Sequence, residues 1–122
     1  MSVSFCNDHV NLTMLTDFYE ITMANGYFVS GFKDTIGYFD MFFRKVPDGG
    51  GFAIMAGVEQ LVDYLKNLSF SDEDIQYLRS KNIFREEFLE YLRNFKFVCD
   101  VWAVPEARRS SRASRSSRCA GR

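Results

Sequence analysis

The spacing of apolar residues predicts four helices. Asp17 followed by Glu20 has the spacing of a capping box, so a first helix is expected to begin near Asp17. Ser71 with Asp74 marks a second start of the same kind. Apolar faces at helical spacing are Val58, Leu61, Val62 and Leu65; Ile75 and Leu78; and Phe84, Phe88, Tyr91, Leu92 and Phe95. Helices are therefore predicted over 58–65, after Ser71 and over 84–95.

Three other stretches have the composition of strands. Residues 35–44 are rich in aromatic side chains, which suits a strand. Residues 52–56 follow a break at 47–51. Residues 97–104 are apolar on both faces except for Asp100. The short break between the first two predicts a hairpin. The order helix, strand, strand, three helices, strand predicts the α+β class, a small domain with its helices packed on a short, mostly antiparallel sheet.

The first helix has two apolar faces. One contains Phe18, Ile21, Ala24 and Phe28, and the other contains Tyr19, Met23 and Tyr27. A surface helix that covers a core on one side needs only one such face. This helix is therefore expected to be covered on both sides, by its own sheet and by another domain or subunit.

Length and composition limit the class of protein. With 122 residues, 47% of them hydrophobic, the chain has room for one small packed domain. The three cysteines lack metal or disulfide spacing, no signal peptide is apparent, and no apolar run could span a bilayer. We therefore expect a cytoplasmic protein that makes no use of the membrane, with no metal site. Residues 1–10, which include the only histidine, His9, are expected to form an irregular lead-in.

Residues 107–122 differ from the rest of the chain. They contain six arginines, five serines and no acid, which leaves nine basic and sixteen acidic residues in 1–106, a formal charge of −7. Without large apolar side chains or a period, this tail is expected to be disordered. It could be an RNA-binding or phosphorylatable Arg/Ser segment or a solvated extension. The acidic body argues against a nucleic-acid partner.

A frameshift is a third interpretation of the tail. Codons for 107–122 can be chosen so that one additional G before them changes the segment into GTPIFPREPIVTVRGP. The body then continues as VWAVPEGTPIFPREPIVTVRGP, which has the apolar character of a strand. We therefore hypothesise a shift of one base after Glu106, either in the organism or in the sequence record.

Two short segments carry candidate chemistry. Thr16–Tyr19 lies at a helix start, where free backbone N–H groups favour anions, and Tyr19 offers a ring that could stack on a flat heteroaromatic ligand. Arg44 offers a planar fork for phosphate or carboxylate, and Lys45 adds a point charge. Spacing alone favours the simpler alternatives, in which Asp17 only caps, Tyr19 only packs and the basic pair is solvated. No catalytic triad, Cys–His pair or metal cluster can be assembled.

Three motifs in residues 11–106 resemble the nicotinate phosphoribosyltransferase family. LTDFYEITMANGY, FDMFFRKVPDGGGFAIMAGVE and VWAVPE occur in the family's order and spacing. The sequence is also similar to that family in the neighbouring frame of 107–122. The resemblance implies an N-terminal domain, here incomplete, of an enzyme that converts nicotinate and phosphoribosyl pyrophosphate to nicotinate mononucleotide with ATP hydrolysis and Mg²⁺, in NAD salvage.

The resemblance also implies roles for single residues. Tyr19 would stack on the pyridine ring in the partner subunit of a homodimer, with Asp17 capping and orienting its helix, and Arg44 and Lys45 would lie near the phosphoribosyl phosphates. The family's β/α barrel, which carries the phosphorylated histidine and most substrate and Mg²⁺ contacts, is absent from this chain. We therefore expect this chain to bind no ATP or Mg²⁺ and to lack turnover alone. The alternative is a stand-alone binding or dimerisation module without catalysis.

Overall fold

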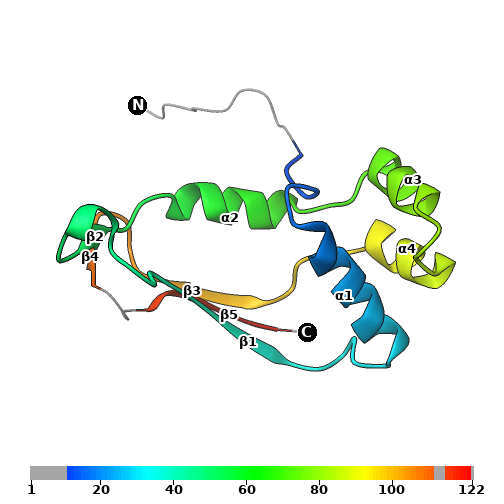
Figure 1. The fold of residues 1–122 in the computed structure, drawn as a ribbon, viewed down its shortest axis with the longest axis horizontal. Helices are drawn as coiled ribbons and strands as arrows, with labels where there is room; N and C mark the ends of the chain where they lie inside the picture. Colours follow the sequence, from blue (N-terminus) through cyan, green and yellow to red (C-terminus); the bar gives the residue numbers. More distant parts are fainter. Residues whose placement is uncertain (1–10, 112–114, 122) are drawn as a thin grey trace. The chain divides into compact units, whose positions relative to one another are not determined.

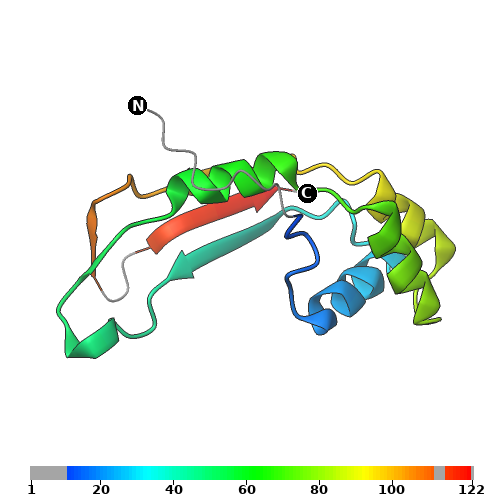
Figure 2. The same cartoon turned by 90° about the horizontal axis from the view of Figure 1, so that it is seen from above.

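A computed structural model describes residues 11–111 and 115–121 (Figures 1 and 2). The predicted lead-in at 1–10, with Cys6 and His9, lies outside these residues. The elements in chain order are α1 (Phe18–Val29), β1 (Gly37–Phe42), the 3₁₀ turn η1 (Pro47–Gly49), β2 (Ala53–Ile54), α2 (Val58–Asn67), α3 (Asp72–Ser80), α4 (Glu86–Arg93), β3 (Asp100–Ala103), β4 (Arg109–Ser110) and β5 (Arg115–Gly121). All four predicted helices and all three predicted strands are present. No described helix is long and apolar enough to cross a membrane.

The chain forms two compact units, where the sequence predicted one layer of helices on a sheet. The first unit contains the described residues up to Val29 and Asn67–Lys96, and the second contains Ser30–Lys66 with the described residues from Phe97 onward. The class is α+β, with helices and small antiparallel sheets and no closed barrel among the described residues.

The first unit is helical and contains the main hydrophobic core. Its buried side chains come from all three of its helices: Ile21 of α1, Ile75 and Leu78 of α3, and Phe88, Leu89 and Leu92 of α4. The inner face of α1 is therefore covered by helices α3 and α4, and the prediction that its own sheet covers it is wrong. Helix spacing on three short segments is enough to form this core because each contributes one apolar stripe.

The predicted capping box begins α3. The Ser71 hydroxyl accepts a hydrogen bond from the backbone N–H of Asp74 at 3.1 Å, and the Ser71 N–H donates to the Asp74 carboxylate at 2.8 Å. Two backbone N–H groups that lack intrahelical partners are thereby satisfied. The helix after Ser71 therefore begins at a capping box that can be recognised from the sequence alone.

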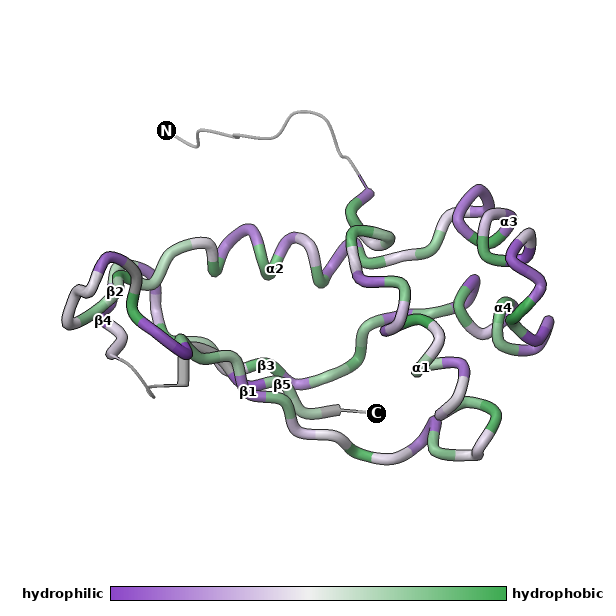
Figure 3. Tube along the Cα trace, in the orientation of Figure 1, coloured by the Kyte–Doolittle hydropathy of each residue, from purple (hydrophilic) through white to green (hydrophobic). Residues whose placement is uncertain are grey.

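The second unit contains two sheets and α2. The larger sheet has the order β1-β5-β3 and the smaller has the order β2-β4, with every pair antiparallel. The predicted hairpin between β1 and β2 is therefore wrong. The partners of both strands come from residues beyond Glu106, which local turn chemistry could not indicate. Helix α2 lies along β3, and its turns alternate between polar and apolar residues in Figure 3.

The tail also differs from its expectation. Where disorder was predicted over 107–122, the structure has strands at Arg109–Ser110 and Arg115–Gly121. Strand pairing uses backbone N–H and C=O groups, which an Arg/Ser segment has like any other. The composition that suggested disorder therefore does not prevent the segment from completing a sheet whose two outer strands are β1 and β3.

Candidate substrate-binding surface

Helix α1 holds Tyr19 by packing its opposite face. Ile21 is buried, and the ring of Phe28 lies 5.6 Å from that of Phe88 and 5.3 Å from that of Tyr91, between centroids. Phe18 meets Phe84 edge-on at 5.9 Å. Aromatic contacts of this kind fix the rotation of a helix about its axis. The other side of α1 is therefore presented in a defined direction.

That other side is an exposed stripe of large side chains, Tyr19, Met23 and Tyr27. Their exposed fractions are 58%, 49% and 55%. Within the described residues, the second apolar face predicted from the sequence is left about half exposed. Exposed apolar residues that lie together on one helix face mark an interaction surface more often than scattered ones do.

Asp17 directly precedes α1. Its carbonyl accepts the N–H of Glu20 at 3.0 Å, while the Glu20 carboxylate accepts a hydrogen bond from the Thr16 hydroxyl. The side-chain contact at this start is therefore Thr16–Glu20, one residue earlier than the predicted pair. The cap and orienting role of the Asp17 carboxylate stays a prediction.

Arg44 and Lys45 lie at a bend directly after β1, and both are exposed. The next residue, Val46, is buried and anchors the bend. The chain then turns through Asp48 and Gly49, whose φ angles are 55° and 66°. Of the triple glycine, Gly49 has this left-handed conformation, which glycine adopts without strain. The turn leaves the two cations free to face an anion in solvent.

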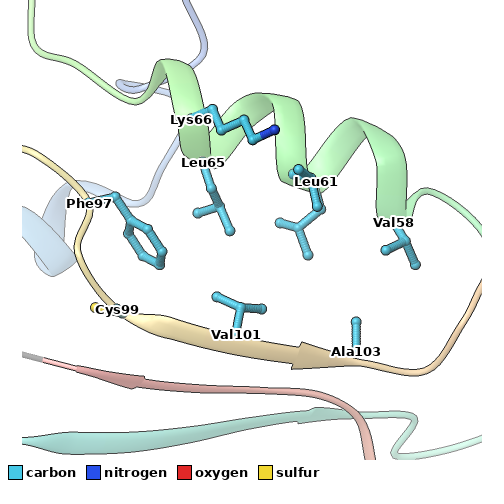
Figure 4. A pocket seen from close by; sticks show the side chains of 9 residues that line it. Val58, Leu61, Leu65, Lys66, Phe97, Cys99, Val101 and Ala103 are labelled. Carbon is cyan, nitrogen blue, oxygen red and sulfur yellow. The ribbon is translucent and has the colours of Figure 1, made fainter.

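The four predicted site residues form two pairs. Asp17 and Tyr19 lie in the helical unit, and Arg44 and Lys45 lie in the sheet unit. None of the four lines the groove between α2 and β3, a cavity of about 400 Å³ with mostly apolar walls (Figure 4). Within the described part of the chain, no three His, Cys, Asp or Glu residues lie together as metal ligands would.

The contact between Glu106 and the start of α2 was not predicted from the sequence. Its carboxylate oxygens accept the N–H of Gly57 at 2.8 Å and the N–H of Val58 at 3.0 Å, at the start of α2. Negative charge at a helix N-terminus is favourable because the backbone N–H groups there lack partners. Glu106 and Gly57 are 49 residues apart. No local spacing signal connects them.

The sequence model of the nicotinate phosphoribosyltransferase (NAPRTase) N-terminal domain matches residues 14–116. The chain belongs to this family. The match extends ten residues past Glu106, so it includes β4 and the start of β5.

Relatives and a solved structure agree with this assignment. A nicotinate phosphoribosyltransferase of Mycobacterium tuberculosis is 40% identical over 93 residues, which is 76% of this chain and 20% of the relative. One of Bacillus subtilis is 37% identical over 79 residues, or 65% and 16%. The crystal structure of human nicotinic acid phosphoribosyltransferase superposes with a TM-score of 0.79 at 33% identity, over 87% of this chain and 22% of the human one.

The chain spans about a fifth of the length of these relatives. Within that fifth, the family match includes both pairs of candidate residues, the exposed stripe of α1 and the bend after β1. A nicotinate phosphoribosyltransferase N-terminal domain is therefore what the described fold represents. The remaining four fifths of the relatives have no counterpart in the residues described.

Proposed function

We propose that this chain is the N-terminal part of a nicotinate phosphoribosyltransferase acting in NAD salvage in the cytoplasm. The observation that carries the proposal is the family match over residues 14–116, with the human structure superposing over 87% of the chain. The reaction of the whole enzyme transfers phosphoribosyl from phosphoribosyl pyrophosphate to the nitrogen of nicotinate, and nicotinate mononucleotide and pyrophosphate are formed. ATP and Mg²⁺ belong to parts of the enzyme that this chain does not include.

Tyr19 is proposed to stack on the pyridine ring. Its ring is exposed and attached to a helix whose other face is fixed by Ile21 and Phe28. A flat heteroaromatic ring gains dispersion and quadrupole energy against such a face. The exposed stripe that includes Tyr19 supports a position at a subunit interface, so that Tyr19 completes the site of the partner in a homodimer.

Arg44 and Lys45 are proposed to hold phosphate of phosphoribosyl pyrophosphate. The guanidinium of Arg44 can donate two parallel hydrogen bonds to phosphate oxygens, and Lys45 supplies a compact second charge. Both lie on a bend whose conformation is fixed by buried Val46 and by the turn at Asp48 and Gly49. The bend therefore places two cationic side chains side by side in the sequence where an anion can reach them from solvent.

The chain alone is proposed to lack turnover. It offers a stacking face and two cations for phosphate, and it corresponds to about a fifth of the length of the relatives that it matches. The test is an assay for nicotinate mononucleotide with the purified chain, nicotinate, phosphoribosyl pyrophosphate, ATP and Mg²⁺. No product above the buffer background is expected, and product that scales with chain concentration would disprove this part of the proposal.

A second candidate is a dimerisation module without catalysis. The observation that favours it is the stripe of Tyr19, Met23 and Tyr27, exposed by about half. Size-exclusion chromatography with an intact nicotinate phosphoribosyltransferase tests the module. A module elutes together with the enzyme and loses this association in the Tyr27→Asp variant, and a chain that elutes apart from the enzyme would disprove this candidate.

A further inference from the structure

Two residues after Glu106, Ser110 and Cys119, occupy positions that their side chains do not suit. Strand β5 is the middle strand of its sheet, between β1 and β3. Middle strands pair on both edges and are typically rich in β-branched and aromatic residues. Here the local composition, RSSRCAG, conflicts with the position in the fold. In natural sequences the local composition and the position in the fold usually agree.

Ser110 shows the conflict at a single atom. Its side chain is 2% exposed, and its hydroxyl oxygen is buried with no hydrogen-bond partner in the part of the chain that the structure describes. Leaving a buried hydroxyl unpaired costs free energy, and most such groups in native proteins are paired. The position opposite Ala53 in the β2-β4 pair is therefore suited to an apolar side chain.

Cys119 shows the same conflict on the larger sheet. It lies directly across from Phe39 on β1 and from Val101 on β3. Those two side chains are 73% and 38% exposed, although they flank a middle strand. A larger apolar residue between them would cover more of each, because directly opposed side chains on one sheet face are close neighbours.

The neighbouring frame supplies the residues that these positions lack. One additional base before Ala107 keeps the number of residues in 107–122 unchanged and gives GTPIFPREPIVTVRGP. In that frame position 110 is isoleucine and position 119 is valine. Position 120, which pairs with Asp100, becomes arginine, an opposite charge directly across the strand pair, at a position where Ala120 is 9% exposed. The other frame fits the observed register without an insertion or deletion, and it replaces Arg118, which donates to the Asp40 carboxylate at 2.8 Å, with threonine.

We infer that the strand completing this fold is encoded one base out of frame, so that 107–122 stands in the place of GTPIFPREPIVTVRGP. The inference rests on Ser110, on the partners of Cys119 and on the sequence letters, and it is independent of the proposed enzyme activity. It bears on that activity because the strand it restores pairs with β1, and β1 ends at the bend of Arg44 and Lys45.

The first test is the DNA sequence across the codon for Glu106 and past the end of the coding segment. The inference requires that the actual codons of 107–122 spell GTPIFPREPIVTVRGP when they are read with one additional base in front of them. This holds both for a shift in the gene of the organism and for a base missing from the sequence record. Codons that spell a different segment in that frame overturn the inference.

The second test compares three full-length chains: the present one, a chain with 107–122 replaced by GTPIFPREPIVTVRGP, and a chain with the same replacement residues in shuffled order. Fluorescence of Trp102, the single tryptophan, reports on β3. We expect the ordered replacement to raise the urea midpoint by about 0.5 M or more over both other chains. An equal midpoint for the ordered and shuffled replacements contradicts the inference. Ser110→Ile alone is expected to shift the midpoint in the same direction.

Discussion

The carboxylate of Glu106 binds the N–H of Gly57 at the start of α2, at 2.8 Å. This contact joins Glu106 to the glycine that directly precedes α2, and a second bond reaches Val58 at 3.0 Å. Gly57 has a φ angle of 93°, which favours glycine at this point. The start of α2 therefore depends on a residue from the far end of the chain.

Replacing Glu106 with alanine is expected to lower the free energy of unfolding of the sheet unit by about 1 kcal/mol, the typical cost of losing a helix cap. Urea unfolding followed by Trp102 fluorescence measures the change. Glu59→Ala is the matched control, since Glu59 is an exposed acid in the first turn of the same helix. Equal costs for the two variants would show that general charge, and not the contact to Gly57, stabilises α2.

Tyr19→Ala separates packing from binding. Because the ring is more than half exposed, the variant is expected to change the free energy of unfolding by no more than about 0.5 kcal/mol. Ile21→Ala, on the buried side of the same helix, is expected to cost about 2 kcal/mol or more. Circular dichroism during urea unfolding measures both. A loss at Tyr19 as large as that at Ile21 would favour the alternative in which Tyr19 only packs.

The ion pair between Arg79 and Glu86 predicts a pH dependence. The hydrogen bond from Arg79 lowers the pKa of Glu86. Because the folded-state pKa is below the unfolded one, the pair stabilises the fold above the unfolded pKa, and this stabilisation is lost as the pH falls through the folded pKa. The difference in thermal midpoint between the wild-type chain and Glu86→Gln should therefore disappear in acid. Both side chains are largely exposed, so the effect is small. A difference that persists at low pH would rule out this origin.

Oxidation tests the position of β5. The register places Cys119 opposite Val101, two residues from Cys99 on the neighbouring strand. Burial raises the pKa of the Cys119 thiol, and the adjacent Cys99 thiol raises that pKa further. In a Cys6→Ser chain, diamide is expected to form an intramolecular disulfide between Cys99 and Cys119, faster at alkaline pH because the thiolate is the reacting species. Mass spectrometry after digestion identifies the linked peptides. Intermolecular disulfides alone would contradict the register.

Local signals predicted the helices, and non-local pairing accounts for what they missed. The capping box at Ser71 and Asp74 and the stripe through Phe88 and Leu92 each involve residues within a few turns of each other. The partner of β1 lies about eighty residues later, in a segment whose composition suggested disorder. Backbone pairing leaves little trace in composition, so the hairpin between β1 and β2 was predicted wrongly.

The roles of the candidate site residues stay predictions. Tyr19 lies on an exposed helix face, and Arg44 and Lys45 lie on an exposed bend. Residue spacing alone did not distinguish ligand binding from packing or simple solvation at these positions. The family was predicted from the three motifs in residues 11–106. The contact of Glu106 with α2 could not be predicted because its two ends are joined only in three dimensions.

A chimera in which residues 14–106 of this chain replace the matching part of the Mycobacterium tuberculosis relative tests the proposed function of this chain. The measurement is the rate of nicotinate mononucleotide formation with all substrates and Mg²⁺ present. We expect an active chimera in which Tyr19→Ala lowers kcat/KM by about tenfold or more, the value of one aromatic stacking contact. Met23→Ala, the control on the same stripe, should change kcat/KM little. A folded chimera without activity, or one whose activity is unchanged by Tyr19→Ala, would disprove the proposed function.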